Sequence, residues 1–328
     1  MLTSRHKDIV ADFESYQREV FEQLQPKGLY EPVRYLLNQP GKRLRPLLCL
    51  LTAEGIGGPK DKIFPLAAAI EVFHNFTLMH DDIMDEAPTR RGVPTVHYKY
   101  TTAQAILSGD VMLIWSYRLL MDLDMPEEQK LFINQRFSQV ATEICEGQQM
   151  DMDFESRGDV TVGEYLRMIE LKTAVLLGAS MELGAIAAGF DHSKASELYD
   201  FGRLLGLSFQ IQDDWLDAFG DPELTGKKPG GDVSRKKKTL IYLEAMEVMP
   251  AAVRTKLESL FHENKQMADD DVDWVLQQFR EYDIHKKVSS QVEMKMDEAL
   301  EHLGRAAIPE RLAEELRSFA EAIVFRSY

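Results

Sequence analysis

The chain has 328 residues, of which 45% are hydrophobic, and its formal net charge is −16 at pH 7. This acidic excess argues against non-specific binding to nucleic acid or to an anionic membrane surface, because both need a basic excess. The two cysteines, Cys49 and Cys145, are too few for a disulfide framework, and no apolar run reaches the roughly 18 residues of a membrane-spanning helix. We therefore expect a globular cytoplasmic protein without an integral membrane segment.

Apolar residues recur at helical spacing along nearly the whole chain, whereas β-branched alternation is scarce. This pattern predicts an all-α fold, with one domain over residues 1–328. The expected helices cover residues 5–24, 28–38, 43–55, 62–87, 102–122, 127–155, 162–189, 193–219, 235–248, 251–262, 269–302 and 309–326. The run 220–232, rich in Gly, Lys and Pro, predicts a binding loop or a lid.

Two Asp-Asp-x-x-Asp motifs, at residues 81–85 and 213–217, are embedded in apolar helical sequence. Asp81 and Asp85 share a helical face, and the same spacing places Asp213 and Asp217 on another. Carboxylates crowded on a mostly buried helix need a compensating cation, and hard oxygen ligands fit Mg²⁺ better than Zn²⁺. A single motif would also fit a solvated acidic turn. Two of them together favour metal sites.

Basic clusters accompany both motifs, and guanidinium and ammonium groups are suited to phosphate oxygens. They lie at residues 41–46, 90–92, 172–173, 227–228 and 235–239, and the last of these is expected to begin a helix. Each cluster alone also fits a solvated basic patch. His74, on the face of Asp81 and Asp85, fits either a packed core histidine or a phosphate donor.

The ordered set of motifs resembles the trans-type prenyl diphosphate synthases, also called polyprenyl synthetases. The resemblance is strongest over residues 35–245 and rests on Gly41-Lys42-Arg43-Leu44-Arg45-Pro46, His74, the two acidic motifs, Arg90-Arg91-Gly92, Gly147-Gln148-x-x-Asp151, Lys172-Thr173, Phe209-Gln210 and Gly226-Lys227. It implies an isoprenoid-synthase-like helical bundle around a deep central cavity. It also implies a prenyltransferase that joins isopentenyl diphosphate to dimethylallyl, geranyl or farnesyl diphosphate, and that forms a homodimer.

The resemblance also implies roles for particular residues. The isopentenyl diphosphate site would use Gly41, Lys42, Arg45, His74 and Arg91, and the allylic diphosphate would contact Arg90, Lys172, Lys227 and Lys237. Three Mg²⁺ ions would be bound by Asp81, Asp85 and Asp213 as principal ligands, with Asp217, Asp82 and Asp214 in support and Gln148 and Asp151 nearby. The backbone carbonyl of Lys172 and the side-chain oxygens of Thr173 and Gln210 would stabilise the allylic carbocation. The loop length leaves the choice among Lys236, Lys237 and Lys238 open, and the spacing from Asp232 favours Lys237.

Product length in this family depends on bulky side chains just before the first motif. Phe76 and the small Thr77 stand there, and the motif has no insertion. This pattern favours geranylgeranyl diphosphate (C20), with farnesyl diphosphate (C15) and a C25 product as alternatives. Phe76 could equally be ordinary core packing, which is compatible with its forming the cavity floor.

Two other classes of protein compete with this interpretation. A terpene cyclase also ionises an allylic diphosphate, but it has no need of Lys42, Arg45 and Arg91 for a second diphosphate. A non-catalytic subunit of a heteromeric synthase needs no intact catalytic set, whereas this chain retains every member.

Overall fold

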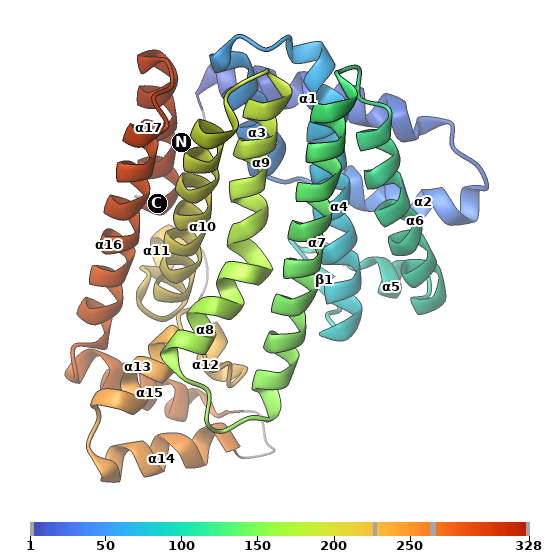
Figure 1. Cartoon of the computed structure of the whole chain (residues 1–328). Coiled ribbons are helices and arrows are strands. Elements are labelled where there is room, and N and C mark those ends of the chain that lie inside the picture. Colours follow the sequence, from blue (N-terminus) through green and yellow to red (C-terminus); the bar gives the residue numbers. More distant parts are fainter. Residues whose placement is uncertain (1–2, 226–227, 263–266, 326–328) are drawn as a thin grey trace. The chain divides into compact units, whose positions relative to one another are not determined.

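The computed structural model describes residues 3–225, 228–262 and 267–325, and almost all of them lie in helices (Figure 1). By contacts the chain divides into two compact units. The first comprises Met1–Ser138, Ala179–Glu197 and Ala306–Leu312, and the second comprises Gln139–Gly178, Leu198–Arg305 and Ala313–Tyr328. The all-α prediction is confirmed. A single domain over residues 1–328 and a deep central cavity stay predictions.

The first unit contains six helices in chain order and one small hairpin among its described residues. These are α1 (Ser4–Glu22), α2 (Lys27–Leu37), α3 (Leu44–Ile56), α4 (Lys60–Met84), β1 (Thr89–Arg90), β2 (Val93–Pro94), α5 (Val96–Lys99) and α6 (Thr102–Met121). Helices α3 and α6 pack against α4, whose segment Ala67–Ile70 is fully buried. The core of this unit therefore surrounds the helix that ends in the first acidic motif.

The second unit holds a further set of helices, from four to 22 residues long. They are α8 (Val162–Ile169), the π turn η1 (Glu170–Ala174), α11 (Pro222–Thr225), α12 (Gly231–Ser234), α13 (Leu240–Val248), α14 (Ala251–His262), α15 (Asp269–Glu281) and α16 (Ile284–Arg305). Four helices have residues in both units, namely α7 (Glu127–Ser156), α9 (Val175–Ala187), α10 (His192–Phe219) and α17 (Glu310–Val324).

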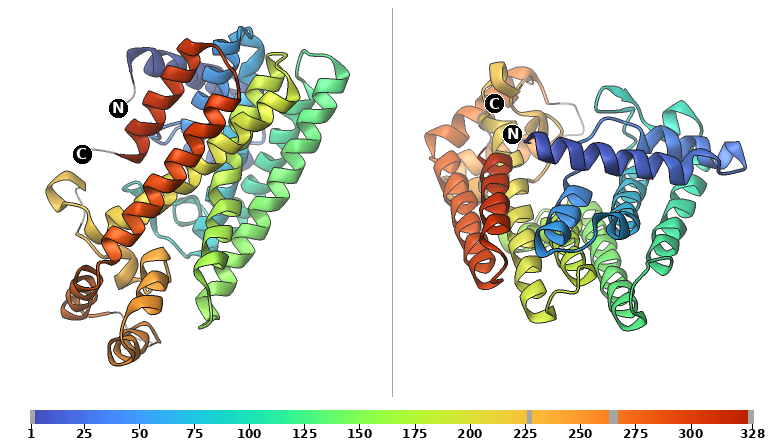
Figure 2. Two further views of the ribbon diagram at one scale, coloured as in Figure 1. Left: turned by 60° about the vertical axis from the view of Figure 1, so that its left-hand side comes forward. Right: turned by 90° about the horizontal axis from the view of Figure 1, so that it is seen from above.

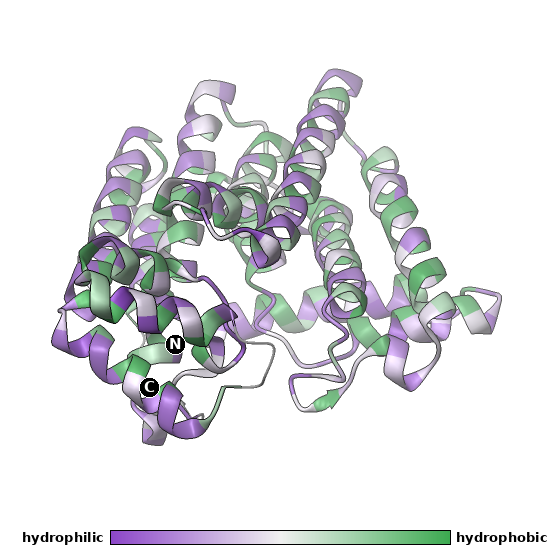
Figure 3. Ribbon diagram, turned by 90° about the horizontal axis from the view of Figure 1, so that it is seen from below, coloured by the Kyte–Doolittle hydropathy of each residue, from purple (hydrophilic) through white to green (hydrophobic). Residues whose placement is uncertain are grey.

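The helices are amphipathic in the way that their sequences predict. Along α16, six apolar residues spaced three or four apart are buried, from Ile284 to Leu303. This helix runs beside α17 in both views of Figure 2, and hydrophilic and hydrophobic turns mix along the helices in Figure 3. No helix in the described ranges has the length and apolar character needed to traverse a bilayer.

Three predicted helices differ from those observed. The helix expected over 269–302 is interrupted at Asp283, whose φ of 56° is left-handed, so α15 and α16 are separate. Residues 235–239 do not begin a helix, because Lys236 has a φ of 58° and Thr239 is the extended residue before α13. The helix expected over 162–189 contains the π turn η1, since the amide of Val175 bonds to the carbonyl of Glu170.

Candidate functional site

The first acidic motif lies at the carboxyl end of α4. Asp81 and Asp82 belong to its last turn, and Asp85 is the residue that ends the helix. Because the last carbonyls of a helix carry partial negative charge, carboxylates are disfavoured there unless cations compensate them. Burial raises the pKa of the Asp82 carboxyl, and Arg90 opposes that shift. The end of α4 therefore concentrates negative charge and requires cations.

Arg90 supplies one of these cations from the β1–β2 hairpin. Its Nε donates to Asp82 Oδ1 at 2.8 Å, and its Nη2 lies 3.4 Å from Asp81 Oδ2. The hairpin turns through Arg91 and Gly92, both with positive φ (53° and 79°), as a two-residue turn of the primed type requires. The turn thereby holds two adjacent arginines beside the end of α4.

Arg91 lies against the loop that precedes α3. Its Nη1 donates to the carbonyl of Pro40 at 2.7 Å, and a Cβ on Gly41 would be only 2.8 Å from the same nitrogen. Glycine at position 41 therefore allows the guanidinium to approach the backbone. The first unit thus brings together Gly41 and Arg91, which the resemblance assigns to the isopentenyl diphosphate site, and the exposed Lys42 is the next residue in the loop.

Arg45 and His74 form a close pair in the same unit. Arg45 Nη1 donates to His74 Nε2 at 3.1 Å, because a guanidinium has no acceptor. Burial and the neighbouring arginines hold the pKa of His74 well below its usual range, so the ring is neutral at pH 7. Burial also lowers the pKa of Arg45 to about 10, which leaves it charged. With Nε2 accepting from Arg45, the neutral ring orients this arginine.

Phe76, the predicted floor residue, packs between two aromatic rings. Its centroid lies 5.6 Å from that of Phe73 and 4.9 Å from that of His80. A Cβ on Gly109 of α6 would be 2.2 Å from His80 Nε2, so only glycine leaves room for this ring. Thr77 donates from Oγ1 to the carbonyl of His74 at 2.8 Å.

In the second unit, the second acidic motif also lies in the last turns of its helix, α10. Asp214 is 5% exposed and accepts from the Tyr165 hydroxyl at 2.6 Å and from Gln210 Nε2 at 3.3 Å. Burial raises the pKa of Asp214 to about 7, although both donors lower it. This carboxyl is therefore poorly compensated by the protein alone.

Asp217 organises the glycine-rich loop. Its Oδ2 accepts from the amide of Asp232 at 2.7 Å, and its carbonyl accepts from the amide of Gly230 at 2.6 Å. One carboxylate oxygen is thus engaged with the start of α12. The predicted Lys227 and its neighbour Gly226 lie outside the described residues.

Lys172 lies in the π turn η1, and its Nζ donates to Asp151 Oδ2 of α7 at 2.6 Å. A Cβ on Gly147 would be 2.4 Å from the amide nitrogen of Lys172, and a Cβ on Gly206 would be 2.8 Å from the Cα of Ala174. The absence of a side chain at these two glycines, on α7 and α10, therefore leaves room for the widened turn. Single π turns occur frequently at functional sites.

The lysines of the cluster 235–239 differ in their surroundings. Lys238 Nζ donates to the carbonyl of Phe154 at 3.0 Å and to that of Arg157, at the end of α7. Its amine is therefore already occupied at a helix carboxyl end, whereas Lys237 is exposed. This contact favours Lys237 over Lys238 as a substrate contact.

Comparison with known proteins identifies the family. The sequence model of the family described as polyprenyl synthetase matches residues 26–279. The chain belongs to the polyprenyl synthetase family. A geranylgeranyl diphosphate synthase from Methanosarcina mazei is 42% identical to this polyprenyl synthetase over 244 residues, which cover 74% of each chain.

Two further proteins are similar to this polyprenyl synthetase. A geranylfarnesyl diphosphate synthase from Natronomonas pharaonis is 42% identical over 247 residues, which cover 70% of this chain and 72% of that one. The solved structure of a geranylgeranyl pyrophosphate synthetase from Pyrococcus horikoshii gives a TM-score of 0.92 at 32% identity, covering 99% of this chain and 98% of that one. The isoprenoid-synthase-like helical fold predicted from the motifs is thereby confirmed.

The residues of this polyprenyl synthetase fit Mg²⁺, the metal that the family uses. Asp81 and Asp85 offer hard carboxylate oxygens at a helix carboxyl end, and Asp213 does so in the second unit. Within the described ranges, no three His, Cys, Asp or Glu side chains converge as a metal-binding group. Mg²⁺ typically uses only one or two carboxylates together with water and substrate phosphate.

Two residues of this polyprenyl synthetase were missed from the sequence. Tyr165 had no assigned role, although it donates to Asp214, and Arg43 stood inside a quoted motif without a function of its own. Both are buried polar residues in otherwise apolar or basic stretches. That burial depends on tertiary contacts, and only the polar character was visible in the sequence.

Proposed function

We propose that this polyprenyl synthetase condenses isopentenyl diphosphate with allylic diphosphates, head to tail, to form all-trans geranylgeranyl diphosphate (C20). Family membership carries the prenyltransferase activity. The observation that supports a short product is the position of Phe76 between Phe73 and His80, one turn before Asp81. The relatives named geranylgeranyl diphosphate synthase support the C20 length.

The basic residues of the first unit hold isopentenyl diphosphate in this proposal. Arg45 and Arg91 remain charged at neutral pH, and Lys42 is exposed beside them. Neutral His74 fixes the direction of Arg45 through the 3.1 Å contact. These groups bind the diphosphate of the nucleophile and direct its double bond toward the allylic substrate.

The allylic substrate ionises, and its pyrophosphate is the leaving group. Bound Mg²⁺, which we propose as three ions, would supply charge stabilisation of the leaving pyrophosphate. Asp81, Asp85 and Asp213 would hold the metal, with Asp217 in support, and Arg90, Lys172, Lys227 and Lys237 would contact the pyrophosphate oxygens. Pyrophosphate then accepts the proton that is lost after the new carbon–carbon bond forms.

The allylic carbocation must be stabilised by dipoles whose atoms do not react with it. The backbone carbonyl of Lys172, in the π turn, and the side-chain oxygens of Thr173 and Gln210 are suited to this task. Gln210 donates from Nε2 to Asp214 at 3.3 Å, which leaves its Oε1 as the acceptor end. The contact with Asp214 therefore orients the amide dipole.

A C25 product is the second candidate. Relatives named geranylfarnesyl diphosphate synthase, from Natronomonas pharaonis and Aeropyrum pernix, are 42% and 41% identical to this chain. These identities are close to the 42% and 44% of two relatives named geranylgeranyl synthases, so product analysis is needed to separate the two lengths.

The deciding experiment incubates the full chain with labelled isopentenyl diphosphate, Mg²⁺ and each of the C5, C10 and C15 primers, followed by product sizing. We expect C20 from all three primers. A C15 or C25 product would overturn the proposed length, and no elongation with any primer would overturn the synthase function.

Phe76→Ala tests the floor role directly. Without this ring the cavity floor would move to a bulky side chain further along the helix. One helical turn is about 5.4 Å, comparable to one isoprene unit, so we expect C25 and longer products. Phe132→Ala is the matched control, because Phe132 packs on His192 instead, with centroids 4.4 Å apart. An unchanged product distribution in Phe76→Ala would remove Phe76 from this role.

We also propose that the enzyme is a cytoplasmic homodimer. Large apolar side chains are exposed along α6 and at the start of α7, namely Ile106, Leu107, Ile114, Met121 and Leu131. Exposed apolar patches of this kind typically mark protein interfaces. Light scattering of the purified chain measures the mass that decides between monomer and dimer.

A further inference from the structure

Arg43 precedes α3 and lies in the sequence between two predicted diphosphate-binding residues, Lys42 in the loop and Arg45 in the first turn of α3. The side chain of Arg43 is only 3% exposed, which is too little for direct contact with a substrate. Its φ of 48° is left-handed, a conformation that a residue with a Cβ adopts only where its surroundings enforce it. A permanently charged guanidinium at such a depth must be fully partnered.

The partners of Arg43 come from three different segments. Nε donates to Glu14 Oε1 of α1 at 3.0 Å, and Nη1 donates to Glu71 Oε1 of α4 at 2.9 Å. Nη2 donates to the carbonyls of Leu37 and Gln39, at 2.5 and 2.9 Å, where α2 ends. All three guanidinium nitrogens are therefore used within the protein.

The inner partner, Glu71, connects this arginine to the site. Glu71 is three residues before His74 on α4, and its Oε1 also accepts from Asn75 Nδ2 at 3.1 Å. The carboxylate is 4% exposed, so the pair with Arg43 is screened little by water. The loop that carries Lys42, and the first turn of α3 that carries Arg45, are thereby attached to α4, the helix that carries His74.

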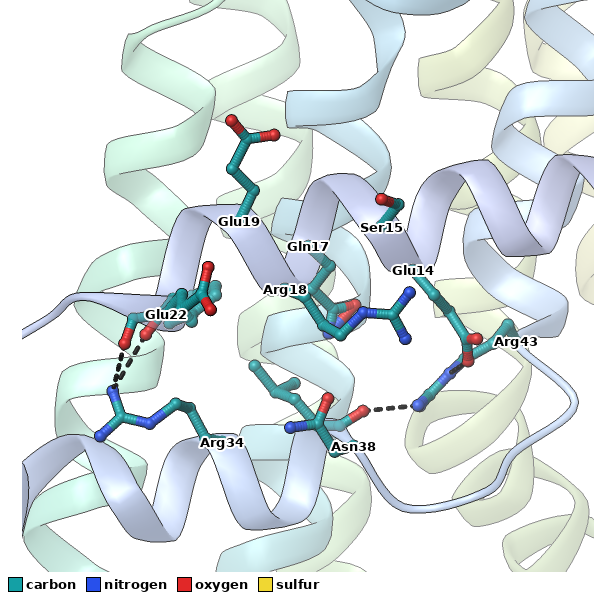
Figure 4. A pocket seen from close by; sticks show the side chains of 11 residues that line it. Glu14, Ser15, Gln17, Arg18, Glu19, Glu22, Arg34, Asn38 and Arg43 are labelled. Atoms are coloured by element: carbon teal, nitrogen blue, oxygen red, sulfur yellow. Dashed lines mark hydrogen bonds and ion pairs between the residues drawn. The ribbon is translucent and has the colours of Figure 1, made fainter.

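The outer partner, Glu14, lies at the edge of a groove between α1 and α2. Figure 4 shows Glu14 and Arg43 meeting at one end of this groove, with Arg34 at the other end, where it donates to the carbonyl of Phe21 at 3.0 Å. Glu14 is 34% exposed, much more than Glu71. Loss of Glu14 should therefore weaken the fastening of the loop without leaving a deeply buried charge unpaired.

We propose that Arg43 is a positioning residue for the isopentenyl diphosphate pocket, with Glu71 as its inner anchor and Glu14 as its outer one. It touches no substrate and acts by holding residues 41–45 in the single conformation that presents Lys42 and Arg45. This inference rests on the proposed function of those two residues.

Arg43→Met, Arg43→Lys and Glu14→Gln test the proposal in the full chain. Affinity for isopentenyl diphosphate is measured by calorimetry, and KM is measured for both substrates. We expect Arg43→Met to weaken isopentenyl diphosphate binding about tenfold or more while KM for the allylic substrate changes less than about twofold. Arg43→Lys should recover part of the loss, and Glu14→Gln should cause a smaller loss of about twofold to fourfold.

Arg34→Met is the matched control, because it removes an arginine from the same groove without touching the loop. It should leave the affinity for isopentenyl diphosphate within about twofold. Equal losses for both substrates in Arg43→Met, or no loss in Glu14→Gln, would overturn the proposal. Glu14→Gln also serves if Arg43→Met does not fold. A wild-type chain that binds isopentenyl diphosphate but condenses nothing would contradict the proposed function alone, and the binding comparison would still decide the role of Arg43.

Discussion

At the scale of single residues, the ionisable groups of the first unit are arranged to keep one ring neutral among several cations. His74 contacts Arg45 directly and also lies in the field of Arg90, Arg91 and Arg43. Protonating it would add a buried positive charge beside existing ones. The ring therefore serves as an acceptor that directs Arg45, and this role depends on its neutral state.

His74 should make the stability of the protein sensitive to acid. Its folded pKa lies below the unfolded value of about 6.5, so the unfolded chain binds the proton more readily. This contribution to stability is present above the unfolded pKa of about 6.5 and is lost progressively as the pH falls below it toward the folded pKa. The free energy of unfolding of the wild type should therefore fall more between pH 7.5 and 5.5 than that of His74→Asn. Equal pH slopes for the two proteins would contradict this assignment.

At the scale of elements, the close approach of helices around η1 depends on residues without side chains. Gly147 of α7 faces the backbone of Lys172, and Gly206 of α10 faces Ala174. The π turn widens the helix, so its neighbours have no space for a Cβ. The same contacts hold Lys172 where its amine reaches Asp151.

Gly147→Ala should separate α7 from η1. Its Cβ would be 2.4 Å from a backbone nitrogen, which cannot move aside as a flexible side chain can. We expect a loss of roughly 1–3 kcal/mol in the free energy of unfolding, from overpacking, together with lower turnover. Chemical denaturation measures the first and product formation the second.

Gly163→Ala is the control for this change. Gly163 lies in helix α8, and a Cβ there would meet nothing within 4 Å. Alanine should stabilise that helix by about 0.5–1 kcal/mol and leave activity unchanged. If both alanine variants behaved alike, the packing argument for Gly147 would fail.

At the scale of the whole molecule, the two acidic motifs belong to different compact units, yet the proposed chemistry needs both. Each lies at the carboxyl end of a long helix, α4 or α10, where the helix itself disfavours negative charge. A bound cation would offset this unfavourable interaction. The presence of an acidic motif at a helix carboxyl end in each unit therefore supports a common role in metal binding.

Asp81→Ala and Asp213→Ala should each reduce turnover by about 10³, because a charge-stabilising partner of the leaving group is lost in each case. Chelation of the metal with EDTA should abolish activity, and added Mg²⁺ should restore it. Asp124→Ala is the control, because this 81% exposed carboxylate pairs with Lys62 outside both motifs. Full activity in either Asp81→Ala or Asp213→Ala would disprove the requirement for both motifs.

Much of this protein was predictable from its sequence because the relevant signals are local. Helical periodicity acts over a few residues, so the all-α fold and most helix positions followed from it. The spacing within 81–85 and 213–217 identified the acidic faces for the same reason. Family membership also followed, because each of the motifs at 41–46, 90–92 and 172–173 is a short continuous run of residues that can be read directly from the sequence.

Other features were decided by contacts between residues far apart in sequence. Tyr165 and Asp214 are 49 residues apart, and Arg43 and Glu71 are 28 apart, so no local pattern connects them. The break at Asp283 and the loop at 235–239 escaped prediction because their composition suits a helix, whereas Asp283 and Lys236 adopt left-handed backbone conformations in the structure. Periodicity and spacing determine which side chains share a helical face, but the burial that turns a polar residue into a partner, and shifts its pKa, arises only when distant segments pack together.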